Sequence, residues 1–377
     1  MIKIIEATTK KLQKDFLEFP LSLYKNNEYY VPPLYADEKN IFTKKNDYYE
    51  TCDQVYFNAY QDGIIVGRIS GIIQKQYNEI HKEKRARFTR FDCIDDNEVA
   101  KALISAVEKW AKDKGMDTMC GPLGFSDLER EGLLIEGFDK LSTFEEAYNY
   151  PYYQKLIENS GYEKEVDWLE FRLSYSDKYY DKISKLSDFV LKRYNFHLAK
   201  REKGQSKAAF LNQYKDDFFN ILDECYKSLY GVVPFTEKMK KSIMNQFKLV
   251  IDLKYFIIIC NEKDEGVAFG LCFPGIGKAL QKSGGKINPI SLFRLIKEAK
   301  HPSSVDLGLI AVLPEYQNMA ITAPILKMAM DALKYEGVKY LETNLNLEDN
   351  EKIISCWKYF ENEQHKRRRS FIKKLQD

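Results

Sequence analysis

The sequence has no apolar run of about 20 residues, the length that a membrane-spanning helix needs, and no hydrophobic stretch at its start. It also has no cysteine pair at CxxC spacing. The seven cysteines are scattered and odd in number, and the four histidines lie far apart, so neither a disulfide framework nor a zinc site is indicated. We therefore expect no metal, no membrane span and a cytoplasmic location.

An excess of one charge is missing as well. The chain has 58 basic and 56 acidic residues, which gives a net charge of +2. This balance gives no general attraction to polyanions, so nucleic acid is not an expected partner. The length of 377 residues is long for a single core and suits two domains.

What is present is a strand, loop, helix and strand between residues 305 and 345. Val305–Val312 is apolar and is followed by Pro314, which favours a buried strand. Apolar residues then recur at helical spacing until Gly337, a typical helix stop. A second apolar strand, Val338–Leu345, follows directly. A unit this compact predicts that the two strands pair in parallel.

The loop of this unit, residues 317–322, runs straight into the helix. Free backbone N–H groups and the positive end of the helix dipole meet at such a place, so an anion fits there, and a pyrophosphate fits well. An ordinary turn without a ligand is the competing interpretation of the loop alone.

These residues resemble the signature of the GNAT superfamily, the CoA-dependent N-acetyltransferases. Val312-Leu-Pro-Glu-Tyr316 and Gln317 match it, whereas Ala320 and Thr322 stand where the family usually has small, glycine-type residues. The resemblance implies acetyl-CoA or another acyl-CoA as cofactor. It places the pantetheine arm beside the backbone of Leu309, Ile310, Ala311 and Val312, and the pyrophosphate on Gln317, Asn318, Met319, Ala320, Ile321 and Thr322.

The same resemblance suggests catalytic residues. Asn350 matches the family asparagine that precedes the last helix, and it is also a good N-cap for that helix. Trp357 replaces the usual acid tyrosine, and Tyr359 is the nearest tyrosine. Glu131, on a long acidic connection at residues 121–150, is a candidate base if that loop folds over the cofactor. A solvated charged loop is the alternative.

The order of elements occurs twice along the chain. We therefore predict an α/β fold with a mixed α+β sheet, made of two tandem GNAT-like domains at residues 1–175 and 189–377. In the first copy the segment Cys93–Glu98 carries three acids that would repel a pyrophosphate, so the second copy is expected to hold the cofactor. The whole chain is similar to a group of bacterial GNAT-like proteins, through segments such as Tyr30-Val-Pro-Pro, Gly121-Pro-Leu and Leu347-Glu-Asp-Asn350.

The sequence thus predicts an acyl-CoA-dependent N-acyltransferase with a small-molecule or peptide amine as acceptor. The alternatives are a catalytically degenerate acyl-CoA-binding scaffold and an aminoacyl transferase of the FemABX type. Whether the chain forms a homodimer stays open. A second insertion, Pro274–Ser303, carries a short amphipathic helix near residues 290–299 to which none of these functions assigns a role.

Overall fold

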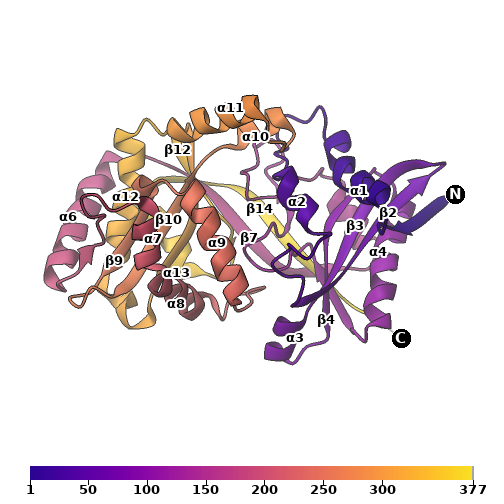
Figure 1. Ribbon diagram of the computed structural model, residues 1–377, viewed down its shortest axis with the longest axis horizontal. Coiled ribbons are helices and arrows are strands. Elements are labelled where there is room, and N and C mark those ends of the chain that lie inside the picture. The colour runs from indigo at the N-terminus through magenta and orange to yellow at the C-terminus, as the bar shows by residue number, and fades with distance from the viewer. Residues whose placement is uncertain (376–377) are drawn as a thin grey trace. The chain divides into compact units, whose positions relative to one another are not determined.

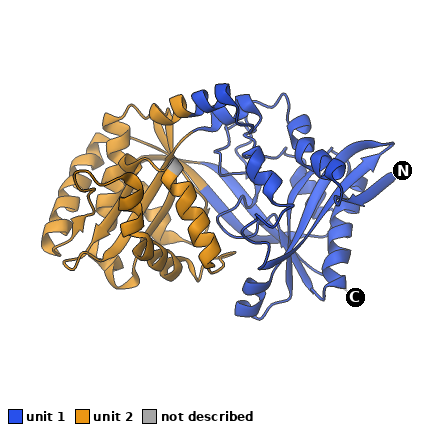
Figure 2. Cartoon of the chain, viewed as in Figure 1, with its two compact units in different colours: residues 1–169, 276–295, 365–377 blue, residues 170–275, 296–364 orange. Residues whose placement is uncertain are grey.

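The computed structural model describes residues 1–375, and for Leu249 and Val250 the backbone alone. The chain forms two compact units, each assembled from separate segments of sequence (Figure 2). Unit 1 contains Met1–Leu169, Ile276–Leu295 and His365–Asp377, and unit 2 contains Glu170–Gly275 and Ile296–Gln364. Among residues 1–375, no helix has both the length and the apolar character of a membrane span.

The sheet of unit 1 is antiparallel except for one parallel pair. Its strands follow the order β1 (Ile2–Glu6), β2 (Cys52–Gln61), β3 (Ile64–Gln74), β4 (Arg85–Cys93), β5 (Thr118–Gly121) and the second part of β14 (Glu361–Lys374), with β6 (Leu133–Glu136) also on β14. The pair β4 and β5 is parallel. Strands β2 and β3 pair as an antiparallel hairpin.

Helix α4 (Asn97–Asp113) covers the sheet of unit 1 because its apolar residues share one face. Leu103 and Val107 are fully buried, and two glycines of β3 let the helix approach closely: a Cβ at Gly71 would lie 2.6 Å from the Val107 side chain. The side chain of Asp96 accepts hydrogen bonds from the first amides of the helix. This carboxylate occupies the helix N-terminus, which fits the expectation that the first copy has no phosphate loop.

The remaining helices of unit 1 come from two parts of the chain. They are α1 (Lys10–Leu23), α2 (Tyr35–Asn40), α3 (Lys75–His81), α5 (Tyr153–Glu158), α10 (Gly277–Ser283) and the first part of α11 (Pro289–Lys300). Figure 1 shows α10 and α11 as consecutive helices. Both lie in the second insertion.

The sheet of unit 2 has the order β7 (Glu163–Ser174, its end), β12 (Tyr340–Thr343), β11 (Ser304–Val312), β10 (Gly266–Pro274), β9 (Phe256–Cys260) and β8 (His197–Leu198). The predicted parallel pairing is confirmed for β11 and β12. The helices of this unit are α6 (Asp177–Arg193), α7 (Lys207–Gln213), α8 (Lys215–Tyr226), α9 (Glu237–Val250), α12 (Thr322–Tyr335) and α13 (Glu351–Ile354), with short 3-10 turns η1 (Leu253–Tyr255), η2 (Pro314–Met319) and η3 (Ser355–Tyr359).

Helix α6 occupies much of the segment that the sequence suggested as the boundary between the copies. It packs along α12, as Figure 1 shows, and the Tyr180 hydroxyl donates a 2.8 Å hydrogen bond to Asp331 of α12. Its buried side chains include Ile183 and Val190. The segment after residue 174 is therefore part of the core of unit 2.

The basic run Lys366–Arg369 forms part of strand β14. Arg369 and Arg367 both bond the carboxylate of Asp167, at 2.7 Å and 3.2 Å. Arg368 is fully buried. Arg367 and Arg369 are therefore paired within unit 1.

The final strands of the two copies are exchanged between the units. Phe371–Lys374 of β14 pairs with β5 in unit 1, whereas Arg172 and Leu173 of β7 pair with β12 in unit 2. Each unit therefore takes its closing strand from the other half of the sequence. The units thus differ from the predicted domains, residues 1–175 and 189–377, which are each continuous in sequence.

Candidate functional site

The expected cofactor site lies wholly in unit 2, where strand β11 runs past its parallel neighbour. Residues Ser304–Leu307 of β11 pair with β12, and the Asn344 amide donates a 3.0 Å hydrogen bond to the Leu307 carbonyl. Within the described chain, no strand pairs with the β12 side of β11 beyond that point. We call this side of residues 308–312 the free edge of β11.

A β-bulge marks the start of the free edge. Leu271 of β10 pairs with Leu309 and Cys272 pairs with Leu307, so Gly308 is an extra residue on β11. A Cβ at Gly308 would lie 2.6 Å from the ring of Phe273, which explains the glycine. Ile310 remains partly exposed although its strand lies inside the sheet. The free edge therefore begins at the bulge and is partly exposed at Ile310.

The free edge presents backbone groups that an extended ligand can pair with. Leu313 donates its amide to the Val267 carbonyl of β10. Because hydrogen-bonding directions alternate along an antiparallel strand, the N–H and C=O groups of Ile310 and Val312 point away from β10. Their carbonyls already accept hydrogen bonds from side chains of Tyr226, Cys225 and Gln317, so the free edge offers its N–H groups to a ligand. Pantetheine contains amides that suit such a strand edge.

Next to the free edge, the chain enters helix α12 through an uncapped turn. Ala320 has a positive φ of 53°, the left-handed conformation that favours glycine. Ile321 is the N-cap residue, and no side chain of the described structure caps the helix there. The Thr322 hydroxyl is in no hydrogen bond that the described residues form. Among the first three residues of this 14-residue helix, Pro324 has no amide N–H and the Ala323 amide donates to the Ala320 carbonyl at 3.0 Å, which leaves the Thr322 amide for an anion.

Gln317 closes this turn rather than facing an anion. Its Nε2 donates to the Val312 carbonyl at 3.1 Å, and its Oε1 accepts from the Lys352 ammonium at 3.1 Å. The side chain ties the end of β11 to α13. It also keeps the positive charge of Lys352 close to the loop.

The predicted catalytic residues are placed apart from one another. Asn350 caps α13, its Oδ1 accepting from the Ile353 amide at 3.4 Å. Tyr359 packs against α6, where its ring centroid lies 6.0 Å from that of Tyr179. Trp357 is buried, and its indole N–H donates a 3.2 Å hydrogen bond to Asn346. Trp357 is therefore a structural anchor of unit 2.

Glu131 belongs to unit 1 and is buried, with 6% of its surface exposed, so the expectation of a solvated loop fails at this residue. Burial raises the pKa of Glu131 well above its ordinary value of 4.5, and the charges of Asp127 and Glu146 raise it further, while Arg87 opposes them. Burial likewise raises the pKa of Asp127, to about 6. Burial thus favours the protonated form of Glu131.

Sequence reasoning missed Tyr226 and Cys225 at the end of α8. The Tyr226 hydroxyl donates to the Ile310 carbonyl at 3.1 Å, and the Cys225 thiol donates to the Val312 carbonyl at 3.1 Å. The apolar spacing of Phe218, Phe219 and Leu222 would have indicated the helix. No sequence signal links its last turn to a strand 84 residues away.

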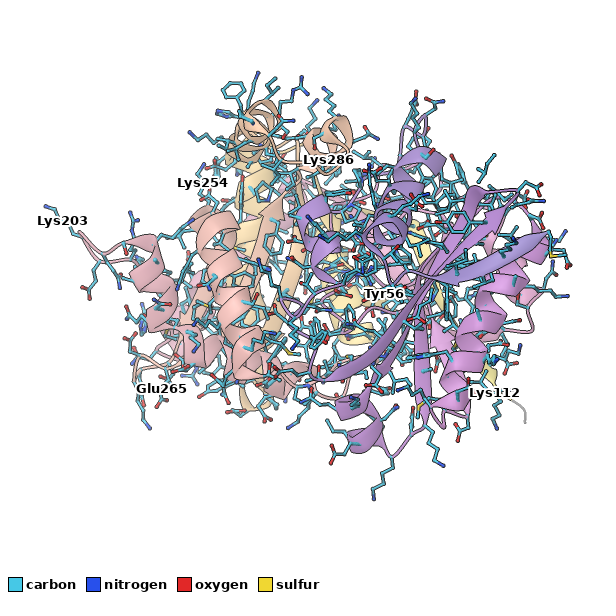
Figure 3. The ribbon with its side chains drawn as sticks, turned by 45° about the vertical axis from the view of Figure 1, so that its right-hand side comes forward. Tyr56, Lys112, Lys203, Lys254, Glu265 and Lys286 are labelled. Carbon is cyan, nitrogen blue, oxygen red and sulfur yellow. The ribbon has the colours of Figure 1, made fainter. Side chains whose placement is uncertain are left out.

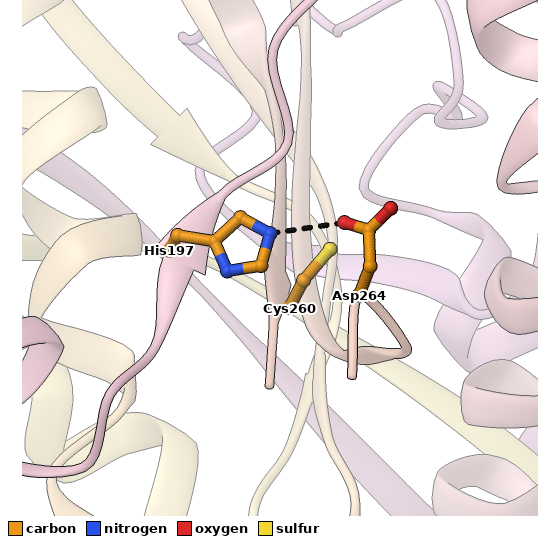
Figure 4. Close-up of side chains that lie close together, drawn as sticks. All are labelled: His197, Cys260 and Asp264. Carbon is orange, nitrogen blue, oxygen red and sulfur yellow. Dashed lines mark hydrogen bonds and ion pairs between the residues drawn. The ribbon is translucent and has the colours of Figure 1, made fainter. Parts of the chain in front are cut away.

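A cluster of His197, Cys260 and Asp264 has residue types that bind metals, with ligand atoms within 4.8 Å of one another (Figure 4). His197 Nε2 and Asp264 Oδ1 already form a 2.9 Å hydrogen bond. Burial raises the pKa of the Cys260 thiol to about 12, and the Asp264 charge adds to this. Metals bind the thiolate, so the cluster is better explained as a link between β8 and the β9–β10 turn.

The architecture of the two units is that of the tandem GNAT fold. A tandem GNAT protein from the clavulanic acid biosynthesis pathway matches with a TM-score of 0.57 at 12% identity, covering 100% of this chain and 99% of that one. No protein-family model matches the sequence.

Two relatives are similar along most of the sequence. Protein YghO of Escherichia coli (strain K12) is 27% identical over 372 residues, which cover 96% of this chain and 93% of that protein. A protein of Caulobacter vibrioides (strain NA1000 / CB15N), named bacterial ceramide synthase, is 25% identical over 327 residues, which cover 84% of this chain and 82% of that protein.

Proposed function

We propose that the protein is an acyl-CoA-dependent N-acyltransferase whose cofactor, acetyl-CoA or a longer acyl-CoA, binds to unit 2. The observation that carries this proposal is the combination of two features on neighbouring segments: the free edge of β11 and the uncapped N-terminus of α12. The free edge of β11 suits the extended pantetheine arm with its amides, and the N-terminus of α12 suits the diphosphate. Acyl transfer in the cytoplasm, the location expected from the sequence, is consistent with this function.

Each part of the site has a role in this proposal. The amides of residues 318–322 hold the diphosphate, and the Ile310 and Val312 amides bind the pantetheine arm. When bound, acyl-CoA supplies a thioester to be attacked by the acceptor amine. Tyr226 holds a proton beside the free edge, where a leaving thiolate would need one. Its hydroxyl replaces the missing acid tyrosine better than Tyr359, which packs on α6.

Asn350 keeps a role in cofactor binding that activity measurements can test. Its side-chain oxygen serves as the N-cap of α13, which leaves its amide N–H groups for a cofactor contact. Glu131 is assigned no role in this site, because it belongs to unit 1 and its burial favours the protonated form, which cannot act as a base.

For the acceptor we infer a long-chain amine. The support is the relative named bacterial ceramide synthase, which is 25% identical over 84% of this chain. A peptide or small polar amine is the alternative expected from the sequence. The two are separated by supplying a sphingoid base, a polyamine and a lysine peptide in parallel.

Cofactor binding is tested first, by thermal shift with CoA, acetyl-CoA and a long-chain acyl-CoA. A matched pair of variants makes the test local. Thr322→Asp puts a carboxylate where the diphosphate would sit, yet acids at a helix start favour the helix, so folding is retained. Thr236→Asp makes the same change at the start of α9, where Thr236 is the N-cap.

We expect the wild type and Thr236→Asp to be stabilised by CoA species, and Thr322→Asp to lose this stabilisation. Stabilisation without release of the free CoA thiol in the presence of any acceptor would favour the acyl-CoA-binding scaffold. An absence of stabilisation by any CoA species would reject the proposed cofactor and favour a scaffold without CoA or an aminoacyl transferase of the FemABX type.

A further inference from the structure

Helix α11, in the second insertion, turns apolar side chains away from the protein. Its only fully buried residue is Ser291. Ile290 and Phe293 are 66% and 69% exposed, Leu292 and Ile296 are each 46% exposed, and Ile287 just before the helix is 56% exposed. A surface helix normally buries its apolar side chains against the core, whereas α11 exposes most of its apolar side chains to solvent.

The clustering distinguishes this surface from ordinary exposed residues. Single exposed apolar side chains are common and need no explanation, and Ile64 and Phe189 are examples elsewhere in this chain. Five of them within ten consecutive residues form a continuous apolar surface. We call Ile287, Ile290, Leu292, Phe293 and Ile296 the α11 surface.

Basic side chains accompany the α11 surface. Lysine or arginine occupies five exposed positions between residues 282 and 300, and Glu298 is the single acid of that stretch. The five are Lys282, Lys286, Arg294, Lys297 and Lys300. Figure 3 shows side chains projecting from this segment, with Lys286 labelled on it. The surface is therefore both apolar and cationic.

The start of α11 is held firmly, so its exposure is a property of the folded protein. Asn288 and Ser291 cap the helix reciprocally, with hydrogen bonds of 3.0 Å and 2.7 Å. The Gly285 carbonyl accepts from the Tyr35 amide at 2.9 Å, and Gln281 donates to the Tyr30 carbonyl at 3.1 Å. These bonds all lie within unit 1 and present the helix outward.

We propose that α11 is a docking helix for an anionic membrane surface. Lying in the plane of the interface, it places the α11 surface among the upper acyl chains and its lysines and arginine among acidic headgroups. At 12 residues the helix is about 18 Å long, too short to span a bilayer. The proposal goes beyond the acyltransferase function and does not depend on it.

The charges favour a membrane over a protein partner. A second copy packed symmetrically on this face would set the same five cations against each other. Lysine is also depleted in protein–protein interfaces. Acidic lipid satisfies both the apolar and the cationic parts of the surface.

The test is vesicle flotation of the full-length protein. Vesicles of phosphatidylcholine alone are compared with vesicles that also contain phosphatidylglycerol, at low and high salt. We expect the wild type to float with phosphatidylglycerol and to be largely released by high salt. The double variant Ile290→Glu/Phe293→Glu should lose flotation at least tenfold. Phe189→Glu, which alters an equally exposed phenylalanine on α6, should float like the wild type.

Two results would overturn the proposal. One is wild-type protein that stays with neither kind of vesicle, and the other is flotation that the double variant retains. A concentration-dependent dimer that the double variant abolishes, without any flotation, would assign the α11 surface to a second copy instead. The thermal shift with CoA should be the same in all these variants, so a failure here stays separate from a failure of the proposed function.

Discussion

The hydroxyl of Tyr226 lies 3.1 Å from the carbonyl oxygen of Ile310 and donates a hydrogen bond to it. The bond joins the end of α8 to the free edge of β11, beside the bulge at Gly308. The neighbouring Cys225 thiol makes the equivalent bond to Val312. Two side chains of one helix turn thus define how much of the strand edge a ligand can reach.

Tyr226→Phe should lower kcat by roughly 100-fold or more while leaving the affinity for CoA nearly unchanged, because it removes a proton donor and little contact area. Steady-state kinetics and a CoA titration measure the two effects. Tyr359→Phe is the control and should behave like the wild type, since Tyr359 packs on α6. If Tyr359→Phe is the inactive variant instead, the assignment of the proton donor is wrong.

Substitutions at Ala320 should show whether the backbone of this turn is strained. Its φ of 53° is costly for any residue with a Cβ, so Ala320→Gly is expected to raise the free energy of unfolding by up to about 1 kcal/mol. Ala320→Val, which adds a β-branch at the same φ, should lower it by about 1–3 kcal/mol. Denaturant unfolding measures both. Equal stability of the two variants would show that the turn is not under strain.

Trp357→Phe should destabilise the protein by about 1–3 kcal/mol, because it leaves the buried Oδ1 of Asn346 without its indole partner. Trp110→Phe is the matched control. Trp110 is half-buried on α4, and its indole N–H forms no hydrogen bond within residues 1–375. A loss of activity without a loss of stability in Trp357→Phe would instead point to a role in the reaction.

The buried acids of unit 1 predict an unusual pH dependence. The pKa of Asp127 is raised to about 6 and that of Glu131 well above 4.5, so the folded protein keeps protons that the unfolded chain has already lost. Stability from these groups is complete below about pH 4, and it falls as the pH rises through 6 and beyond. Denaturant unfolding between pH 4 and 8, values chosen to bracket these pKa values, measures the trend.

The double variant Asp127→Asn/Glu131→Gln should flatten this decline, because neither replacement side chain titrates. At the upper end of the range it should be more stable than the wild type. A decline of the same steepness in the variant would mean that other groups cause it.

Local sequence patterns predicted the elements of this region well. The spacing of apolar residues indicated strand β11 and helix α12, and Pro314 and Gly337 marked where each element ends. They also located the turn of residues 317–322. Tyr226 could not be predicted from the sequence, because its proposed role depends on a contact with Ile310 that only the tertiary fold creates. The charged run Lys366–Arg369 would not by itself indicate a strand, because its partner Asp167 lies about 200 residues earlier in the sequence.

The exchange of closing strands has a consequence for biosynthesis and for protein dissection. Residues 371–374 are translated long after β5, so the sheet that contains β5 cannot be completed until the second copy has been synthesised. A chain that ends after the first copy would leave β5 without its partner β14, as an unpaired strand edge. The second copy expressed alone would leave β12 without its partner β7. Neither half is a natural fragment, and the two copies, whatever their separate origins, now depend on one another to fold.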